Sequence, residues 1–163
     1  MVVLLLVSLA VLMPSLLVRG VVAPLVPGVM FCAPTREPLL ALTIDDGPGP
    51  GSEALLDLLR RLNVRASFFV IGSHLERNPG FVARALEEGH EVGNHLWRDG
   101  RAAGLSKADF LRQLLATERA IQQAAPSGWA ALRWFRPGGG WFHPAMPQLH
   151  NGNEFRCEPR HRP

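Results

Sequence analysis

Short apolar runs alternate along this chain with stretches whose apolar residues recur every three or four positions. The first pattern is typical of buried strands and the second of amphipathic helices, so their alternation predicts βα units in an α/β fold. The predicted strands are residues 39–44, 65–71, 90–95 and 131–135, and the predicted helices are 52–62, 79–89 and 106–125. We therefore expect about four βα units.

Each predicted helix begins beside a residue that favours helix starts. Ser52 is a candidate N-cap for the first helix, and Asn78 is one for the second, with Pro79 at the first helical position. Ser106 precedes the longest helix, with Asp109 three residues later. These positions set the expected helix boundaries.

The first 18 residues carry no charged side chain. This stretch is near the lower limit for spanning a bilayer, and it lacks the basic start of a usual secretion signal. Residues 1–19 are therefore predicted to be either a signal peptide or a membrane anchor, which implies a secreted or membrane-anchored, extracytoplasmic protein. Membrane association would act through residues 1–18, and the Pro-rich residues 20–38 are predicted to be a linker.

Composition and charge exclude several classes of protein. The 163 residues are 47% hydrophobic and 19% charged, which is too apolar for a disordered chain. The net charge is +3, but the arginines are scattered among acidic residues, so no nucleic-acid partner is expected. Cys32 and Cys157 lie at opposite ends without a CxxC pair, so a structural zinc site is not indicated and two unpaired thiols are the simpler interpretation.

Polar side chains follow three of the predicted strands: Asp45 and Asp46, then His95 and Asp99, then Arg136. In parallel α/β folds the carboxyl ends of the strands meet at one edge, where sites are built. Each group also has a structural interpretation: an Asp turn, a hydrogen-bonded His–Asp pair or a surface salt bridge. One turn of helix would place the i, i+4 pair His95 and Asp99 on one face.

Together these residues predict a metal-assisted hydrolase. Asp46, His95 and Asp99 would bind one metal, and Asp45 would act as the general base. Arg136, restrained by the proline that follows it, would donate to a carboxylate. Gly139, Gly140 and Trp141 are predicted to bind substrate, since a flexible Gly-rich loop with an aromatic wall suits a sugar ring, although a packed turn is equally compatible.

Three stretches in order carry a resemblance to a known family. LTIDDGP, GHEVGNHLWRD followed by LS, and RWFRPGGGW are similar to the three early motifs of the polysaccharide deacetylases, carbohydrate esterase family four. RASFFVIG is similar to the second strand of that family. The sequence thus resembles the N-terminal part of the catalytic domain of this family, over residues 39 to about 146.

The resemblance implies a partial distorted (β/α) barrel that removes acetyl groups from chitin, peptidoglycan or xylan. The cofactor would be a divalent metal, usually zinc, with manganese or cobalt as alternatives. By motif position, Asp45 matches the base, Asp46 and His95 match metal ligands, and Arg136 matches the residue that orients the base. Asp99 replaces the second histidine of the motif, which favours a harder metal.

The family's late motifs, including the histidine that acts as general acid, have no counterpart here, and we assign that role to neither His143 nor His150. We expect an incomplete deacetylase-like domain over residues 39–146 and an irregular tail over 147–163, as in a truncated or frame-shifted product. Four barrel strands would leave an open edge and an uncovered face. The alternative function is therefore a catalytically inactive module that binds carbohydrate or metal.

Overall fold

Three parallel strands form the sheet, in the order β1-β2-β3. The computed structural model describes residues 35, 37–129 and 132–140, and its strands are β1 (Thr43–Gly47), β2 (Ser67–Val70) and β3 (Glu91–Asn94). The predicted fourth strand contributes a single parallel bridge, between Asn94 and Phe135. The predicted α/β class is thus confirmed.

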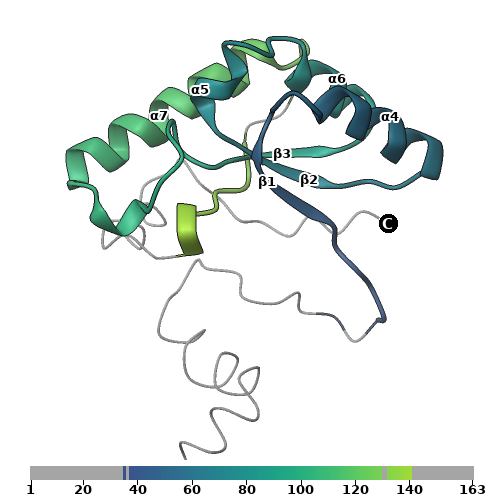
Figure 1. Cartoon of the computed structure of the whole chain (residues 1–163), viewed down its shortest axis with the longest axis horizontal. Coiled ribbons are helices and arrows are strands. Elements are labelled where there is room, and N and C mark those ends of the chain that lie inside the picture. Colours follow the sequence, from purple (N-terminus) through teal and green to yellow (C-terminus); the bar gives the residue numbers. More distant parts are fainter. Residues whose placement is uncertain (1–34, 36, 130–131, 141–163) are drawn as a thin grey trace, which may run out of the picture.

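Four α-helices connect and cover the strands: α4 (Ser52–Leu62), α5 (Gly72–Leu75), α6 (Phe81–Glu87) and α7 (Lys107–Ala124). Two short 3-10 turns, η2 (Ala102–Gly104) and η3 (Gly138–Gly140), complete the described elements. Figure 1 shows the helices in an arc along one side of the sheet, with α6 between α4 and α7. The carboxyl ends of the strands therefore open onto the loops that carry the predicted site.

The strand boundaries differ from those expected at β1. The strand begins at Thr43 rather than Leu39, and it runs through both aspartates to Gly47. Hydrogen bonding to β2 begins at the Leu42 carbonyl, which accepts from the Ser67 amide at 3.0 Å. The apolar residues before it have no neighbouring strand in the described part of the chain, so they do not count as strand.

The helix starts are as predicted in one case of three. Ser106 caps α7 by accepting a hydrogen bond at its Oγ. The expected caps Ser52 and Asn78 are wrong, because a glycine precedes each helix and no side chain caps it. Ser52 Oγ instead accepts from the Gly49 amide at 2.8 Å, and Asn78 Nδ2 donates to the His74 carbonyl at 2.9 Å.

Two clusters of buried apolar side chains hold these elements together. The larger lies between the sheet and α4, α6 and α7. In it the rings of Phe68 and Phe81 pack edge-to-face, with their centroids 5.3 Å apart. The smaller, Leu96, Ala102, Phe110 and Leu114, lies under the loop that follows β3. This second cluster fixes the segment that begins at His95.

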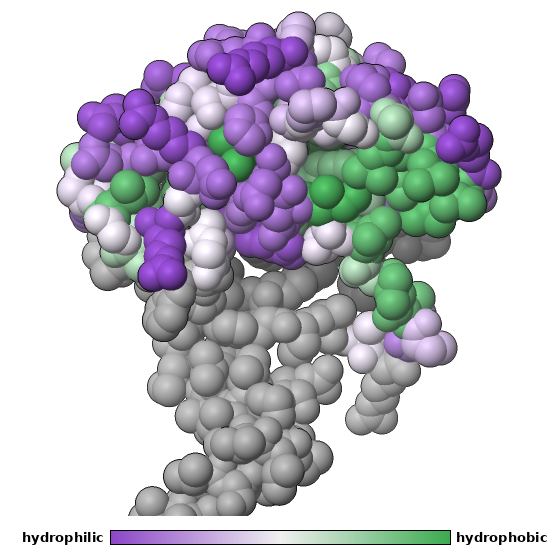
Figure 2. All heavy atoms as spheres, viewed as in Figure 1, coloured by the Kyte–Doolittle hydropathy of each residue, from purple (hydrophilic) through white to green (hydrophobic). Residues whose placement is uncertain are grey.

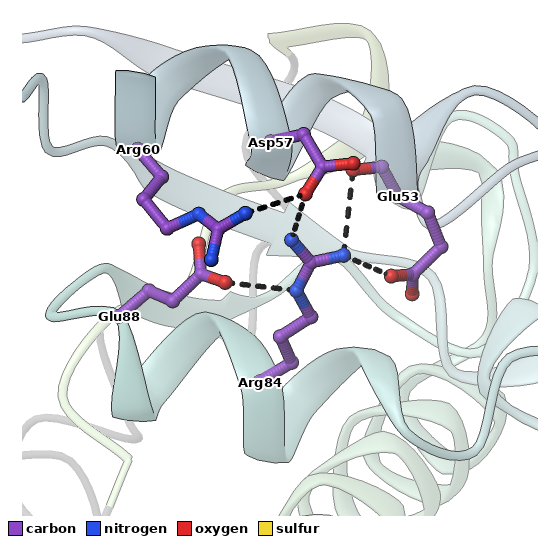
Figure 3. A network of polar contacts seen from close by, with 5 residues as sticks. All are labelled: Glu53, Asp57, Arg60, Arg84 and Glu88. Carbon is purple, nitrogen blue, oxygen red and sulfur yellow. Dashed lines mark hydrogen bonds and ion pairs between the residues drawn. The ribbon is translucent and has the colours of Figure 1, made fainter. Parts of the chain in front are cut away.

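An ion-pair network joins α4 to α6 at the surface (Figure 3). Arg84 Nη2 lies 2.6 Å from Asp57, its Nε lies 2.8 Å from Glu88, and its Nη1 pairs with Glu53. The hydrogen bond from Arg84 lowers the pKa of Asp57, and the bonds to the three carboxylates raise the pKa of Arg84. Every nitrogen of this guanidinium is engaged, which suits a clamp between helices.

One side of the molecule exposes apolar side chains, over β1 and α4 (Figure 2). The large apolar side chains that are exposed in the described residues lie before β1, on α4 and just after α4: Leu39, Leu40, Leu42, Leu58, Leu62 and Val64. Within the described residues β1 is an edge strand of the sheet, and the open edge of an incomplete barrel stays an expectation. None of the described helices has the length and apolarity needed to cross a bilayer, and the predicted leader lies outside the described residues.

Candidate active site

Four of the predicted site residues lie together at the carboxyl ends of the strands. Asp45 and Asp46 are at the end of β1, His95 directly follows β3, and Arg136 follows the bridging residue Phe135. Two side-chain contacts join them in pairs: Asp45 with Arg136, and Asp46 with His95. The parallel topology thus gathers residues that lie up to 91 positions apart.

A β-bulge explains how two consecutive aspartates reach different partners. Between Ile44 and Gly47, β1 has one residue more than the facing Phe68–Val70 segment of β2. Asp46 has a left-handed backbone, with φ 62°. In a regular strand, neighbouring side chains point to opposite faces of the sheet, and a bulge redirects one of them. The bulge therefore turns Asp46 toward His95 while Asp45 meets Arg136.

The Arg136 guanidinium holds Asp45 at one oxygen. Its Nη1 donates to Asp45 Oδ1 at 2.7 Å and to Thr43 Oγ1 at 3.0 Å, and its Cζ lies 4.0 Å from the centroid of the Phe69 ring. Asp45 Oδ2 has no hydrogen bond within the described part of the chain. The carboxylate is thus oriented through one oxygen, and the other is free to accept a proton.

His95 has a defined tautomer. Its Nδ1 lies 2.7 Å from the Arg136 carbonyl oxygen, which only accepts, so Nδ1 carries the hydrogen. In the neutral ring the lone pair is then on Nε2, which lies 3.2 Å from Asp46 Oδ1. Two acceptors at this distance require a proton or a cation between them. The ring is buried, whereas the Asp46 side chain is 61% exposed and open to such a cation.

This pair of donors fits a divalent metal. Imidazole nitrogen and carboxylate oxygen are zinc ligands, and two donors about 2.0–2.1 Å from one tetrahedral ion lie roughly 3.3 Å apart. A metal-binding histidine usually donates its other ring nitrogen to a carbonyl or carboxylate, as His95 does. Asp46 and His95 would therefore hold a metal.

Asp99 does not join them as the i, i+4 argument predicted. The residues from His95 to Asp99 form no helical turn, since Leu96 has a left-handed backbone with φ 69° and the chain bends from Trp97 onward. Across the described ranges, no group of three His, Cys, Asp or Glu side chains is arranged to hold a metal. The predicted set of three ligands is thus reduced to a pair in this structure.

The Gly-rich segment forms a turn of 3-10 helix rather than an open loop. Gly139 has a positive φ of 67°. Gly138 packs so closely on the loop after β3 that a Cβ there would lie 2.0 Å from the Gly100 oxygen. Trp141 lies outside the described residues, so substrate binding by Gly139, Gly140 and Trp141 stays a prediction.

Two residues at this edge were missed by sequence reasoning. Asn94 is fully buried, and its side chain donates to the Leu114 carbonyl at 2.9 Å and accepts from the Leu96 amide at 2.8 Å. It ties the loop that carries His95 to α7. His74 contacts the Asp46 carbonyl from α5 at 3.1 Å, and nothing in its sequence context indicated this.

Comparison with known proteins gives the same family as the motifs. The family profile described as "Polysaccharide deacetylase" matches residues 33–156. The peptidoglycan-N-acetylglucosamine deacetylase PgdA of Listeria monocytogenes is 46% identical over 83 residues, which are 50% of this chain and 18% of that protein. The profile thus covers both the strands and the loops of the candidate site.

Solved structures of similar proteins share this fold, and this chain covers about half of the length of each of them. The peptidoglycan deacetylase PdaC of Bacillus subtilis is 34% identical, with a TM-score of 0.61 over 71% of this chain and 55% of that one. A family 4 acetyl xylan esterase of Clostridium thermocellum, in complex with a cobalt ion, is 32% identical, with a TM-score of 0.59 over 65% and 51%. The described fold is thus part of their barrel, and the chain belongs to the polysaccharide deacetylase family.

Proposed function

We propose that this chain takes part in the metal-dependent removal of acetyl groups from a polysaccharide. The observation that carries the proposal is the division of labour between the two aspartates, one held by Arg136 and the other paired with His95. A hydrolase of this type needs a base beside a cation, and the bulge in β1 supplies adjacent carboxylates for the two tasks.

Asp45 would be the general base. Its Oδ1 is held by Arg136, which leaves Oδ2 to take a proton from the water that attacks the acetyl carbon. The Arg136 side chain orients this carboxylate, and the Arg136 carbonyl orients the His95 ring. One residue would thus align both halves of the site.

Asp46 and His95 would hold the metal, most simply zinc, with manganese or cobalt as alternatives. When bound, a divalent metal supplies Lewis-acid polarisation of the acetyl carbonyl and lowers the pKa of water. The cobalt ion in the Clostridium thermocellum relative supports a site of this kind. His95 keeps Nε2 directed at the metal position because its Nδ1 is fixed on a carbonyl.

Peptidoglycan is the substrate that the similar proteins favour, since the Listeria and Bacillus relatives are named for it, and xylan is the alternative from the Clostridium esterase. We propose that the N-acetyl group of an amino sugar is hydrolysed, with the sugar resting against Gly139, Gly140 and Trp141. Chitin fragments offer the same group without a peptide.

Acetate release by the purified full chain tests this proposal. Peptidoglycan, chitooligosaccharides and acetylated xylan would be offered with zinc or cobalt, then with a chelator. We expect metal-dependent acetate release, lowered at least about 100-fold by Asp45→Asn with the bound metal retained. Asp57→Asn, which changes a carboxylate on α4 outside the site, is the matched control and should leave the rate unchanged.

A non-catalytic module that binds carbohydrate or metal is the second candidate. The separation of Asp99 from Asp46 and His95 favours it, since the described residues bring two ligands together rather than three. Stoichiometric zinc binding without acetate release from any of the three substrates would support this candidate against the enzyme.

We also propose that residues 1–18 direct the chain out of the cytoplasm or anchor it in a membrane, which an extracellular glycan substrate would require. Their uncharged composition supports this. Fusion of residues 1–38 to a reporter that is active only after export would test it, with a charged residue placed in the apolar run as the control.

A further inference from the structure

We propose that His74 is a positioning residue that sets the orientation of Asp46 toward His95. The contact is a hydrogen bond from His74 Nδ1 to the backbone carbonyl of Asp46, at 3.1 Å. A carbonyl only accepts, so Nδ1 of His74 carries the hydrogen. The inference rests on the proposed metal centre, because Asp46 is one of its two ligands.

The left-handed backbone conformation of Asp46 requires a stabilising contact of this kind. Its φ of 62° is in the left-handed region, which residues other than glycine seldom occupy and which persists only where the surroundings enforce it. The bulge also removes regular pairing with β2 at this point. A hydrogen bond to the Asp46 carbonyl fixes the peptide plane, and therefore the direction from which its side chain leaves the strand.

Helix α5, which carries His74, also contacts the loop that carries His95, the other proposed metal ligand. At the start of α5, the Gly72 amide donates to the Leu96 carbonyl at 2.9 Å and the Ser73 amide donates to the Trp97 carbonyl at 3.0 Å. Gly72 is packed so tightly that a Cβ there would lie 2.4 Å from the Trp97 ring. α5 therefore links the end of β1 to the residues just after His95, and His74 supplies the link on the β1 side.

Zinc affinity of the full chain and of four variants tests this role. Asparagine places its amide nitrogen where His74 has Nδ1, whereas glutamine places it one bond further out and leucine has no donor. We expect His74→Asn to bind zinc within about threefold of the unsubstituted chain, and His74→Gln and His74→Leu to bind about 10-fold or more weakly. Asn78→Ala removes a neighbouring bond to the His74 carbonyl and should not change the affinity.

Two further readouts separate positioning from general loosening. The visible spectrum of bound cobalt should change in His74→Leu and be restored in His74→Asn, with unfolding temperatures of the metal-free variants as the check on folding. Nitrogen-15 NMR of the metal-free chain should show His74 protonated at Nδ1.

The outcomes distinguish this inference from the proposed function. Equal zinc affinity in all variants, or equal weakening in His74→Asn and His74→Leu, would overturn the role of His74 and leave the metal centre standing. A chain that binds no zinc would refute the metal centre and this role with it. A His74 ring protonated at Nε2 alone would refute the hydrogen bond itself, whatever the affinities.

Discussion

Two histidines flank strand β3, and their difference shows what makes a buried histidine suitable as a ligand. His90 directly precedes the strand and His95 directly follows it, and both are about equally buried, at 5% and 6% exposure. His90 Nδ1 accepts from the Ala66 amide at 3.1 Å, whereas His95 Nδ1 donates to the Arg136 carbonyl at 2.7 Å. In their neutral forms the two rings would therefore be opposite tautomers.

The tautomer decides what each ring presents at Nε2. In His90, Nε2 carries the hydrogen and has no partner within the described residues, and the ring packs edge-to-face on Phe68 at 5.4 Å. In His95, Nε2 faces Asp46 Oδ1 at 3.2 Å, so in the neutral ring its lone pair would share a cation with that carboxylate. Burial alone does not separate a structural histidine from a proposed metal ligand, whereas the backbone group that meets Nδ1 sets which ring nitrogen is available to a cation.

Matched asparagine variants give the largest expected effect. His95→Asn keeps a donor to the Arg136 carbonyl but has no atom at the position of Nε2, so we expect zinc affinity to fall about 100-fold or more. His90→Asn keeps an acceptor for the Ala66 amide and should leave zinc binding unchanged. Isothermal titration calorimetry with zinc measures both affinities. An equal loss of zinc affinity in the two variants would refute the contrast between His90 and His95.

Arg136→Met gives the next largest effect. The backbone carbonyl that holds His95 remains, whereas the side-chain bond to Asp45 at 2.7 Å is lost. We expect kcat for acetate release to fall about 10- to 100-fold with zinc affinity nearly unchanged. Arg136→Lys, which keeps the charge, should recover part of the rate. Loss of zinc binding in Arg136→Met would show that the two halves of the site are not separable.

The sequence predicted β1, β2, β3, α4, α6 and α7 in their order and the edge where the candidate site residues gather, but it did not predict α5 (Gly72–Leu75). The alternation of apolar runs identified β2 and α7 closely, and the rule that parallel strands present their carboxyl ends together brought Asp45, His95 and Arg136 to one place. The motifs supplied the family. These features depend on local pattern and on topology, which a single sequence carries.

The features of the site that could not be predicted from the sequence depend on the backbone angles of single residues. The expected helical turn from His95 to Asp99 is absent because Leu96 is left-handed, and the bulge at Asp46 shifts one residue against β2. The hydrogen bond from His74 joins residues 28 positions apart, so no local spacing could reveal it. Positive φ at residues other than glycine has only a weak sequence signal.

Arg84→Met should lower the stability of the fold without changing the candidate metal site. It compares a structural arginine, Arg84, with the site arginine, Arg136. Arg84 bonds through all three of its nitrogens, whereas Arg136 uses Nη1 alone within the described residues. We expect the unfolding temperature of Arg84→Met to fall by a few degrees, less so at high salt, because surface ion pairs are screened. Zinc affinity should stay the same. A weakened metal site would mean that α4 and α6 help to position the strand ends.

The smallest expected effect is a dependence of stability on pH through His90. Burial lowers the pKa of His90, Arg65 lowers it further, and Glu88 opposes the shift. The stability that this neutral ring contributes is therefore present above the unfolded pKa of about 6.5, and it is lost as pH falls toward the lower folded value. Protonation would also place a hydrogen on Nδ1, where the Ala66 amide needs an acceptor. Thermal unfolding of the metal-free chain at pH 7.5 and 5.5 should show a larger loss of stability than in His90→Asn, whose side chain does not titrate. Equal losses in the two proteins would show that acid acts elsewhere and that protonation of His90 has no measurable effect on stability.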